Sequence, residues 1–537
     1  MTFLDKKEKI MFRFCGKYIT KYKKQLALYL IVSIVSTIIA ILIPVYWGKI
    51  IDLMTTSNDI LTLLQLGIFV LLLGLFNIII CYWNNRCYIV IQTNSAMDIS
   101  ADIIHHLHKI SLNKLQMYDI GYLNESINSD SNSITMFFLS LLINAISNGL
   151  LLILSLFILC SISLTIGLML LLFISIYIVF YLYFRNKLIL KSETFKNARS
   201  SFFSALLEQF TNIKFIKQHA LEDLYRNRLK KDFKIFFKEA LDVQQFFYLY
   251  SSADKILETI ANFCIYILGG ISVINGTISI GAFTIILNFY GRIISSIKYF
   301  VSMGKEYQDN NVSYKRLLGY LDIPEQTHGD EVIDNITSIS CKHLSFYRNN
   351  QQILREFNGA FYKGNIYCIQ GENGSGKTTL IDLITGLYSD EYNGEILYND
   401  IDIKKLNMVK LRQKRVSLLE QSPYLIEGSS KDNIHLTEEH CDNKYYSRMI
   451  KKEIGTISNN GEGISGGERQ KIGILRALSK QSDLLVFDEP TSALDQESKT
   501  VFFEILTEIK KEKIIIFISH DKEIDDIADY VIHMSVI

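Results

Sequence analysis

Glycines, one lysine and two threonines between positions 371 and 379 give this stretch the composition of a phosphate-binding loop. It reads Gly371-Glu-Asn-Gly-Ser-Gly-Lys-Thr-Thr379, and its glycines allow backbone N–H groups to close around phosphate oxygens. Lys377 can bring a full positive charge to the β- and γ-phosphates, and the Thr378 hydroxyl can bind Mg²⁺. The loop is predicted to bind ATP with Mg²⁺ through Gly371, Glu372, Asn373, Gly374, Ser375, Gly376, Lys377, Thr378 and Thr379.

The segments on either side of this loop have the patterns of a strand and a helix. Residues 364–370 (GNIYCIQ) form a short apolar run that is typical of a buried strand, and residues 380–386 have the pattern of a helix start. A phosphate loop needs this order of elements, because the N-terminus of the helix adds a partial positive charge at the phosphates.

Two adjacent acids follow a second apolar strand pattern, DLLVF at 483–487. Asp488 at the strand end can hold Mg²⁺ through water, and Glu489 can polarise the water that attacks the γ-phosphate. A strand followed by two acids is by itself typical of a solvated turn. Here it accompanies a phosphate loop, which favours the catalytic interpretation.

A second anion-binding segment lies between these two motifs. The sequence ISGGE at 464–468 opens a predicted helix over 469–479, and the backbone around Ser465, Gly466 and Gly467 would surround an anion at its N-terminus. One nucleotide does not need two such sites in one domain. We therefore expect this segment to contact the γ-phosphate of ATP held by a second copy of the domain.

Six apolar runs in the first 303 residues are long enough to cross a bilayer, which takes about 20 residues. They cover roughly residues 26–43, 61–83, 137–160, 162–184, 256–274 and 280–303. Lys and Arg concentrate before the first run and after the fourth, whereas the links after the first, third and fifth runs hold almost none beyond Lys49. We predict a multi-pass membrane protein with both termini in the cytoplasm. The polar segments 84–133 and 185–250 should then be cytosolic extensions of the spanning helices.

The bulk composition agrees with a membrane protein. Apolar residues make up 49% of the 537 residues, charged residues 21%, and the mean hydropathy is +0.18. The eight cysteines form no CxxC pair and are expected to be reduced thiols. The N-terminus lacks the pattern of a secretory signal, and with about 25 residues before the first run we expect no peptidase domain there. The Ile-, Lys- and Asn-rich usage indicates a bacterial inner membrane.

In their order along the chain, these motifs resemble those of the nucleotide-binding domain of the ABC superfamily, and the whole chain resembles an ABC exporter half-transporter. The phosphate loop corresponds to Walker A, Asp488 ends Walker B, and Glu489 is the catalytic carboxylate. The resemblance adds Gln421 as the Q-loop residue and His520 as the switch histidine. The remaining family motifs are the signature (Ser465, Gly466, Gly467, Glu468) and the D-loop (Ser492, Ala493, Leu494, Asp495).

The resemblance also implies the fold and the domain boundaries. We expect an α-helical membrane domain of six spans at 1–322, a linker at 323–333, and an α/β P-loop NTPase domain of ABC type at 334–537. An aromatic residue should stack on the adenine, and Tyr347 is favoured over its neighbour Phe346. Short coupling helices near Asn128–Ser133 and near Phe210–Gln218 should dock onto the nucleotide domains.

Three features depart from the family pattern. The signature has Ile464 and Glu468 where Leu and Gln are usual, and Asn459 stands where many exporters have an acid. The interval from Gln421 to Ser465 is short for the family, which predicts a trimmed helical subdomain.

The resemblance implies ATP-driven export by alternating access in a dimer, and a homodimer is favoured because no motif is degenerate. Catalysis would rest on Glu489, His520 and Lys377, with Mg²⁺ held by Thr378, Gln421 and Asp488. A small peptide is the favoured substrate; lipid export, drug export and an ATP-gated channel or regulator are the alternatives. The spans exclude a soluble ATPase of the DNA-repair or translation type, so no nucleic-acid partner is expected.

Several polar residues lie within or near the predicted spans. They either face a substrate cavity or satisfy each other between helices and at helix ends. These residues are Asn144, Asn148, Glu258, Asn262, Asn288, Arg292 and Lys298.

Overall fold

The computed structural model describes residues 6–56, 59–348, 351–388, 392–436, 445–450, 454–458, 463–519 and 522–535. The chain divides into two compact units, which are described separately. The first unit comprises Met1–Ile103 and Asn124–Gly319, and the second comprises Ile104–Leu123 and Tyr320–Ile537. The domain boundaries expected at 322 and 334 remain predictions.

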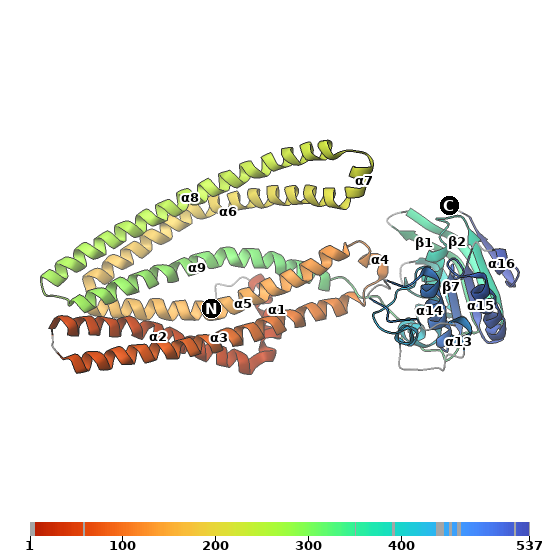
Figure 1. Ribbon diagram of the computed structural model, residues 1–537, viewed down its shortest axis with the longest axis horizontal. Coiled ribbons are helices and arrows are strands. Elements are labelled where there is room, and N and C mark those ends of the chain that lie inside the picture. Colours follow the sequence, from red (N-terminus) through yellow and green to blue (C-terminus); the bar gives the residue numbers. More distant parts are fainter. Residues whose placement is uncertain are drawn as a thin grey trace. The chain divides into compact units, whose positions relative to one another are not determined.

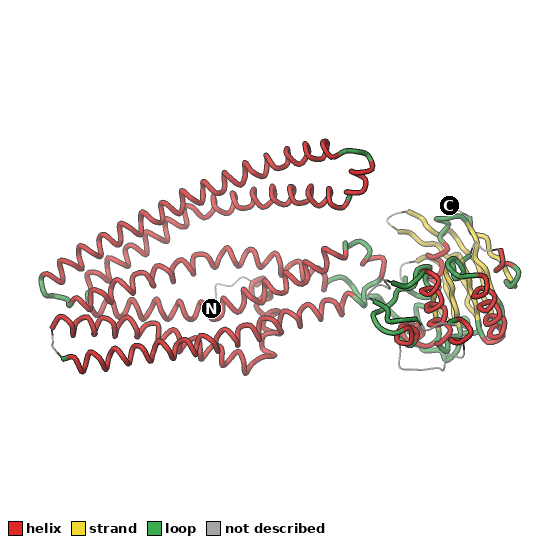
Figure 2. The backbone as a smooth tube through the Cα atoms, viewed as in Figure 1, coloured by secondary structure: helices red, strands yellow, loops and turns green. Residues whose placement is uncertain are grey.

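Long helices build the first unit (Figure 2). Six of the described helices are long and apolar enough to cross a membrane, which confirms the predicted six spans. The helices of this unit are α1 (Lys6–Ile19), α2 (Lys23–Thr56), α3 (Ile60–Leu107), α5 (Ile120–Ile162), α6 (Leu164–Thr211), α7 (Ile213–Gln218), α8 (Glu222–Ile274) and α9 (Ile280–Leu321).

The spanning helices are much longer than a membrane is thick. At about 1.5 Å per residue, the 48 residues of α6 reach about 72 Å, against about 30 Å for the hydrocarbon core. Helices α6 and α8 run side by side as a hairpin closed by the short α7, and this hairpin diverges from the other long helices (Figure 1). Aromatic rings hold the hairpin together, as in the stacked pair Phe202 and Phe236 at 5.2 Å between centroids.

The apolar core of the first unit gathers around α9. Ile286, Phe289 and Ile293 on this helix are completely buried, together with Leu159 of α5 and Ile265 of α8. These α9 residues recur every three or four positions, so they form one face of the helix. The opposite face of α9 is free to carry polar residues.

Two sheets and their covering helices build the second unit. The strands are β1 (Ser338–Arg348), β2 (Gln351–Tyr362), β3 (Ile366–Gly371), β4 (Tyr392–Tyr398), β5 (Ile401–Asp402), β6 (Val416–Leu419), β7 (Leu484–Asp488), β8 (Ile514–Ile518) and β9 (Tyr530–Met534). The helices are α4 (Leu112–Leu115), α10 (Lys377–Ile384), α11 (Met408–Lys414), α12 (Ser430–Ile434), α13 (Tyr446–Met449), α14 (Gly466–Ser479), α15 (Gln496–Ile509) and α16 (Lys522–Asp525).

The larger sheet is parallel and the smaller one antiparallel. The five-stranded sheet has the order β6-β7-β8-β3-β9, and the four-stranded sheet has the order β2-β1-β4-β5. Strands β7 and β8 are fully apolar except at Asp488, as expected for strands covered on both faces. The carboxyl ends of β3, β6, β7 and β8 therefore lie at one edge, where parallel sheets place their ligand sites.

A segment from between α3 and α5 belongs to the second unit. Leu112 of α4 packs against the core of this unit, the backbone N–H of Gln326 donates to the Lys109 carbonyl at 2.8 Å, and the His106 ring contacts the Glu325 carboxylate at 3.1 Å. The first docking element is therefore residues 104–123. The expectation of a coupling helix at Asn128–Ser133 is wrong, because those residues lie inside α5, where the Asp130 carboxylate accepts a hydrogen bond from Arg316 of α9 at 3.1 Å.

The second expected coupling helix coincides with α7, which spans Ile213–Gln218. Asn212 separates α7 from α6, and a turn at Ala220, whose φ is +53°, separates it from α8. The predicted linker at 323–333 is bonded to the segment before α11: the Gly329 N–H donates to the Leu406 carbonyl at 3.1 Å, and the Glu331 N–H donates to the Lys405 carbonyl at 3.1 Å.

Candidate functional site

The phosphate loop connects β3 to α10. Glu372, Asn373 and Gly374 are exposed at its tip, and Ser375 is buried. The loop curls around the Lys377 ammonium group, which donates hydrogen bonds to the carbonyls of Gly371 at 2.6 Å and Glu372 at 2.9 Å. Lys377 is 8% exposed, so its charge points into the loop and not into solvent. Thr379 lies in the first turn of α10.

Glycine is required at Gly376, which ends this loop. Its φ is +88°, and a Cβ there would come within 2.8 Å of the Ile353 carbonyl oxygen on β2. The Ser375 hydroxyl beside it is buried and has no hydrogen-bond partner among the described residues. A buried hydroxyl without a partner in a glycine-rich loop can donate a hydrogen bond to an oxygen of a bound phosphate group.

Two of the three residues predicted to hold Mg²⁺, Thr378 and Asp488, meet at the sheet edge. The Thr378 hydroxyl donates to an Asp488 carboxylate oxygen at 3.3 Å. Burial raises the pKa of Asp488, and the nearby charge of Glu489 adds to the rise, whereas Thr378 and Lys377 oppose it. A hydroxyl and a carboxylate are oxygen ligands of the kind that a hard cation prefers. Burial also makes the negative charge of the carboxylate costly, so a positive ion beside it would be favourable.

Glu489 sits on strained backbone directly after β7. Its φ of +49° is uncommon for a residue with a side chain. Its N–H donates to the Ile518 carbonyl at 2.8 Å, and its own carbonyl accepts from Gln470 at 3.2 Å. The carboxylate accepts from the Gln421 amide at 2.7 Å. These contacts fix the direction of the acid and bring the two predicted residues Gln421 and Glu489 together.

The signature segment begins α14 with a reciprocal capping box. The Ser465 hydroxyl accepts from the Glu468 N–H at 3.3 Å, and the Glu468 carboxylate accepts from the Ser465 N–H at 3.0 Å. Gly466 and Gly467 form the first turn of the helix. The departure at Glu468 therefore has a local structural role, because the acid caps the helix that the signature opens.

The D-loop lies against the signature. A Cβ on Gly467 would come within 2.9 Å of the Ala493 carbonyl oxygen, so the close approach requires glycine. Leu494 is buried, and Asp495 caps α15 by accepting from the Ser498 N–H at 2.8 Å. The other Asp495 oxygen pairs with Lys471 of α14 at 3.2 Å. Ser492 folds back onto Glu489, donating to its carbonyl at 3.1 Å.

Exposure distinguishes the two candidates for the adenine-stacking aromatic. Phe346 is 1% exposed and belongs to the core, whereas Tyr347 is 50% exposed. Tyr347 pairs with Gln352 on β2, next to Ile353, whose carbonyl borders Gly376 of the phosphate loop. His520 and Asn459 lie outside the described residues, as does much of the segment between α12 and α14 that was predicted to be trimmed.

Sequence reasoning missed Asp382, a half-buried acid on α10 whose carboxyl group feels the charge of Asp488. Its pKa is raised to about 6, first by burial and then by the charge of Asp488, while Arg348 acts in the opposite direction. The spacing of five residues after Lys377 places Asp382 on the helix that starts at the phosphate loop. That spacing was the available signal, although an acid in a helix is usually solvent-exposed.

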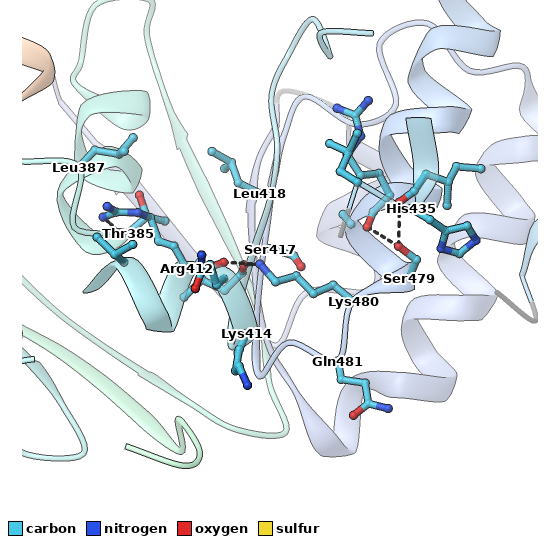
Figure 3. Close-up of a pocket in the computed structure, with 17 residues that line it drawn as sticks. Thr385, Leu387, Arg412, Lys414, Ser417, Leu418, His435, Ser479, Lys480 and Gln481 are labelled. Atoms are coloured by element: carbon cyan, nitrogen blue, oxygen red, sulfur yellow. Dashed lines mark hydrogen bonds between the residues drawn. The ribbon is translucent and has the colours of Figure 1, made fainter. Parts of the chain in front are cut away.

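A separate groove of about 830 Å³ lies at the amino end of β6 (Figure 3). Its basic side chains are tied to backbone carbonyls: Arg412 donates to Gly386 at 2.7 Å, Arg476 to Asn433 at 2.7 Å, and Lys480 to Val416 at 2.7 Å. The groove also presents the apolar side chains of Leu387, Val409 and Leu436.

The polar residues of the spans separate into two groups. Lys298 pairs across α8 and α9 with Asp254 at 2.8 Å and Glu258 at 3.8 Å, so these charges satisfy each other between helices. Asn144 lines one cavity of the first unit, and Asn148, Asn288 and Arg292 line another. Asn262 lies on α8 and is half-buried.

Comparisons with known proteins agree with both units. Residues 26–297 match the family described as ABC transporter transmembrane region, and residues 354–492 match the family described as ABC transporter. The chain is 27% identical over 362 residues to the subtilin transport ATP-binding protein SpaT of Bacillus subtilis, an alignment that covers 63% of this chain and 59% of SpaT. It is 24% identical over 536 residues to the leukotoxin translocation ATP-binding protein LktB of Mannheimia glucosida, covering 96% of this chain and 75% of LktB.

Two further matches extend over nearly the whole chain. The lactococcin-G-processing and transport ATP-binding protein LagD of Lactococcus lactis is 26% identical over 525 residues, covering 93% of this chain and 73% of LagD. Among solved structures, a bacterial Atm1-family ABC exporter with ATP bound has a TM-score of 0.77 at 17% identity, covering 95% of this chain and 93% of the other. That likeness shows a common fold.

Proposed function

This chain belongs to the ABC transporter superfamily as an exporter-type half-transporter, with the transmembrane region and the nucleotide-binding domain fused in one chain, and we propose that it uses ATP hydrolysis to move a small peptide out of the cytoplasm by alternating access. One observation carries the proposal. Four side chains converge at the carboxyl edge of the parallel sheet, in a chain with six spanning helices; they are Lys377, Asp488, Glu489 and Gln421.

The chain's own groups divide the work of hydrolysis. Lys377 and the backbone of the phosphate loop bind the β- and γ-phosphates, and Tyr347 stacks on the adenine. Glu489 orients and polarises the attacking water, and the Gln421 contact holds its carboxylate in place. His520 contacts the γ-phosphate in this scheme.

The residues at the sheet edge fit Mg²⁺. Thr378, Asp488 and Gln421 would hold the ion, which when bound would neutralise charge on the β- and γ-phosphates. Burial makes the charge of the Asp488 carboxylate costly and so raises its pKa, and a cation paired with that carboxylate would offset this cost.

A second chain completes the site in this proposal, with Ser465, Gly466, Gly467 and Glu468 facing the ATP held by Walker A of the partner. Exposed apolar side chains far along the α6–α8 hairpin support a dimer: Phe203 is 52%, Phe210 69% and Ile235 62% exposed. Phe203 lies about 58 Å along α6 from its Leu164 end, beyond the reach of a bilayer core of about 30 Å. A partner chain would cover these groups. We favour a homodimer.

We propose that α7 of the partner chain docks in the groove at the amino end of β6. Ile213 and Phe215 of α7 are 51% and 47% exposed, and the groove offers the apolar side chains of Leu387, Val409 and Leu436. Such a contact would transmit closure of the nucleotide domains to the spanning helices.

Relatives and charge distribution guide the remaining assignments. The relatives are named for the transport of subtilin, lactococcin G and leukotoxin, which supports a peptide as the substrate. The Lys- and Arg-rich segments before α2 and after the fourth span support cytoplasmic termini, and we place the protein in a bacterial inner membrane.

The test is ATP-dependent uptake of peptide into inverted membrane vesicles, with Glu489→Gln vesicles as the control. Uptake by the wild type and none by the variant is expected. ATP-dependent ion conductance without any uptake would contradict export and favour a channel.

A further inference from the structure

The membrane unit contains a polar cavity of about 350 Å³ between α5 and α9. It is lined by Asn148 and Leu151 of α5 and by Asn288, Gly291, Arg292, Ser295 and Ser296 of α9. Its volume is within the usual range for small-ligand sites, about 300–1,000 Å³. No acidic residue contributes to the described lining.

Arg292 is the charged group of this cavity. It lies about 18 Å from the Ile280 end of α9 at about 1.5 Å per residue, close to the middle of a hydrocarbon core of about 30 Å. A charged residue is costly at this depth and is usually paired. Among the described residues, however, Arg292 forms no ion pair and no hydrogen bond.

The other side chains around the cavity are already committed to one another. The Ser296 hydroxyl donates to the side-chain carbonyl oxygen of Asn148 at 3.1 Å, which joins α9 to α5. The Asn148 and Asn288 amides donate to backbone carbonyls one turn earlier, at 2.8 and 3.0 Å. These bonds fix the walls and leave the guanidinium as the group available to a ligand.

The contrast with Lys298 sharpens this assignment. Lys298 lies on the same helix, six positions further, and is paired with Asp254 at 2.8 Å. A second cavity of about 500 Å³, further along α9, is lined by the acids Glu306 and Asp309 and has no basic residue in its described lining. Of these two cavities, the one lined by Arg292 therefore carries an unpaired positive charge, and the other does not.

We propose that Arg292 receives the terminal carboxylate of the transported peptide. The guanidinium presents a planar fork of N–H donors that matches a carboxylate in a two-bond pair. The inference rests on the proposed export of peptides and adds to it a chemical class, peptides with a free carboxyl terminus.

The experiment uses the full chain in phosphatidylcholine nanodiscs and proteoliposomes. Two N-acetylated libraries of random nonapeptides without Asp or Glu serve as probes, one with a free carboxyl terminus and one with a carboxamide. The half-maximal concentration for stimulation of ATP hydrolysis and the ATP-dependent uptake are measured for each library. For the wild type we expect the acid library to act at a concentration at least about tenfold lower, the factor that a charge-assisted hydrogen bond provides.

Variants assign this discrimination to the cavity. Arg292→Gln should bring the acid-to-amide ratio to about one, and Arg292→Lys should restore part of it because the charge remains without the fork. Arg226→Gln, which removes an exposed charge from α8, should keep the wild-type ratio and basal hydrolysis. The acid-to-amide ratio of the wild type is measured without any variant, so an equal action of the two libraries would overturn the inference even if Arg292→Gln does not fold.

Each other outcome has a definite meaning. Equal action of the two libraries on the wild type, or a ratio that persists in Arg292→Gln, overturns the inference and leaves peptide export standing. No uptake and no stimulation by either library would overturn the proposed peptide substrate itself. If phosphatidylglycerol changes basal hydrolysis in the wild type but not in Arg292→Gln, the anion is a lipid headgroup, and the inference is again overturned.

Discussion

Replacing Asp382 by Asn should stabilise the protein, and the gain should depend on pH. Asp382 has a pKa raised from its usual 3.8 to about 6, because burial and the neighbouring Asp488 both disfavour its charge. The folded state therefore holds this proton more tightly than the unfolded state. Stability falls as the pH rises from about 4 to about 6, and the full cost is present above 6. The amide of the Asp382→Asn variant does not ionise, so the variant would carry no such cost.

The size of the effect follows from the shift. A shift from 3.8 to about 6 corresponds to about 3 kcal/mol at about 1.36 kcal/mol per unit. Asp382 is only half-buried, so screening by solvent reduces the figure, and we expect about 1–2 kcal/mol. For a unit of about 200 residues this is a rise in melting temperature of about 2–8 °C.

The assay is differential scanning calorimetry of the purified full chain, without nucleotide and with EDTA, at several pH values from 4 to 7.5. The difference between Asp382→Asn and the wild type should be near zero at pH 4 and maximal above pH 6. Glu427→Gln, at an exposed acid of the same unit, serves as the control and should show no such trend. A gain that is constant across this range, or largest at pH 4, would refute the electrostatic explanation.

Other predictions concern catalysis, the signature, the cavity and the helix core. Glu489→Gln should lower ATP hydrolysis by a factor of about 10² or more while ATP binding, measured by filter retention, persists; wild-type turnover would refute the role of Glu489. Glu468→Gln keeps the capping geometry but removes a negative charge near the predicted phosphate contact, so the KM for ATP should fall about two- to fivefold in steady-state assays; an unchanged or higher KM would count against that contact. Gly291→Leu should leave the melting temperature unchanged, because a Cβ there meets no atom within 4 Å, yet abolish peptide stimulation of hydrolysis; full stimulation would exclude this cavity. Asp130→Ala removes the buried carboxylate that pairs with the partly exposed Arg316 guanidinium and should cost about 1–3 kcal/mol, less than for a fully buried pair because solvent screens Arg316; the cost should be visible as a lower unfolding temperature in detergent.

Much of the fold could be predicted because the relevant signals are local. A span is a run of about 20 apolar residues, and a phosphate loop combines positive-φ glycines with a strand before it and a helix after it. The parallel sheet follows from short apolar strands alternating with helices. The order β6-β7-β8-β3-β9 then gathers Lys377, Gln421 and Asp488, which are far apart in the chain.

The first docking element was misplaced for a physical reason. Helices α3 and α5 both continue through the polar segment 84–133, whose composition changes little along its length, so hydropathy does not mark where the chain reverses. The available signal was Asp119, whose carboxylate accepts from the Tyr122 N–H at 2.7 Å and starts α5. Long-range effects such as the coupling of Asp382 to Asp488 have no sequence pattern, because they depend on burial and on the sheet edge.

The placement of residues 104–123 in the second unit has a consequence for synthesis. This segment leaves the ribosome about 200 residues before the strands that will receive Leu112. At about 5–20 residues per second, the delay is roughly 10–40 s. During that time α5 to α9 must enter the membrane while the segment waits without its partner surface. The nucleotide-binding unit is thus completed only after the membrane unit, and a transporter that stalls in translation would expose residues 104–123 to proteases.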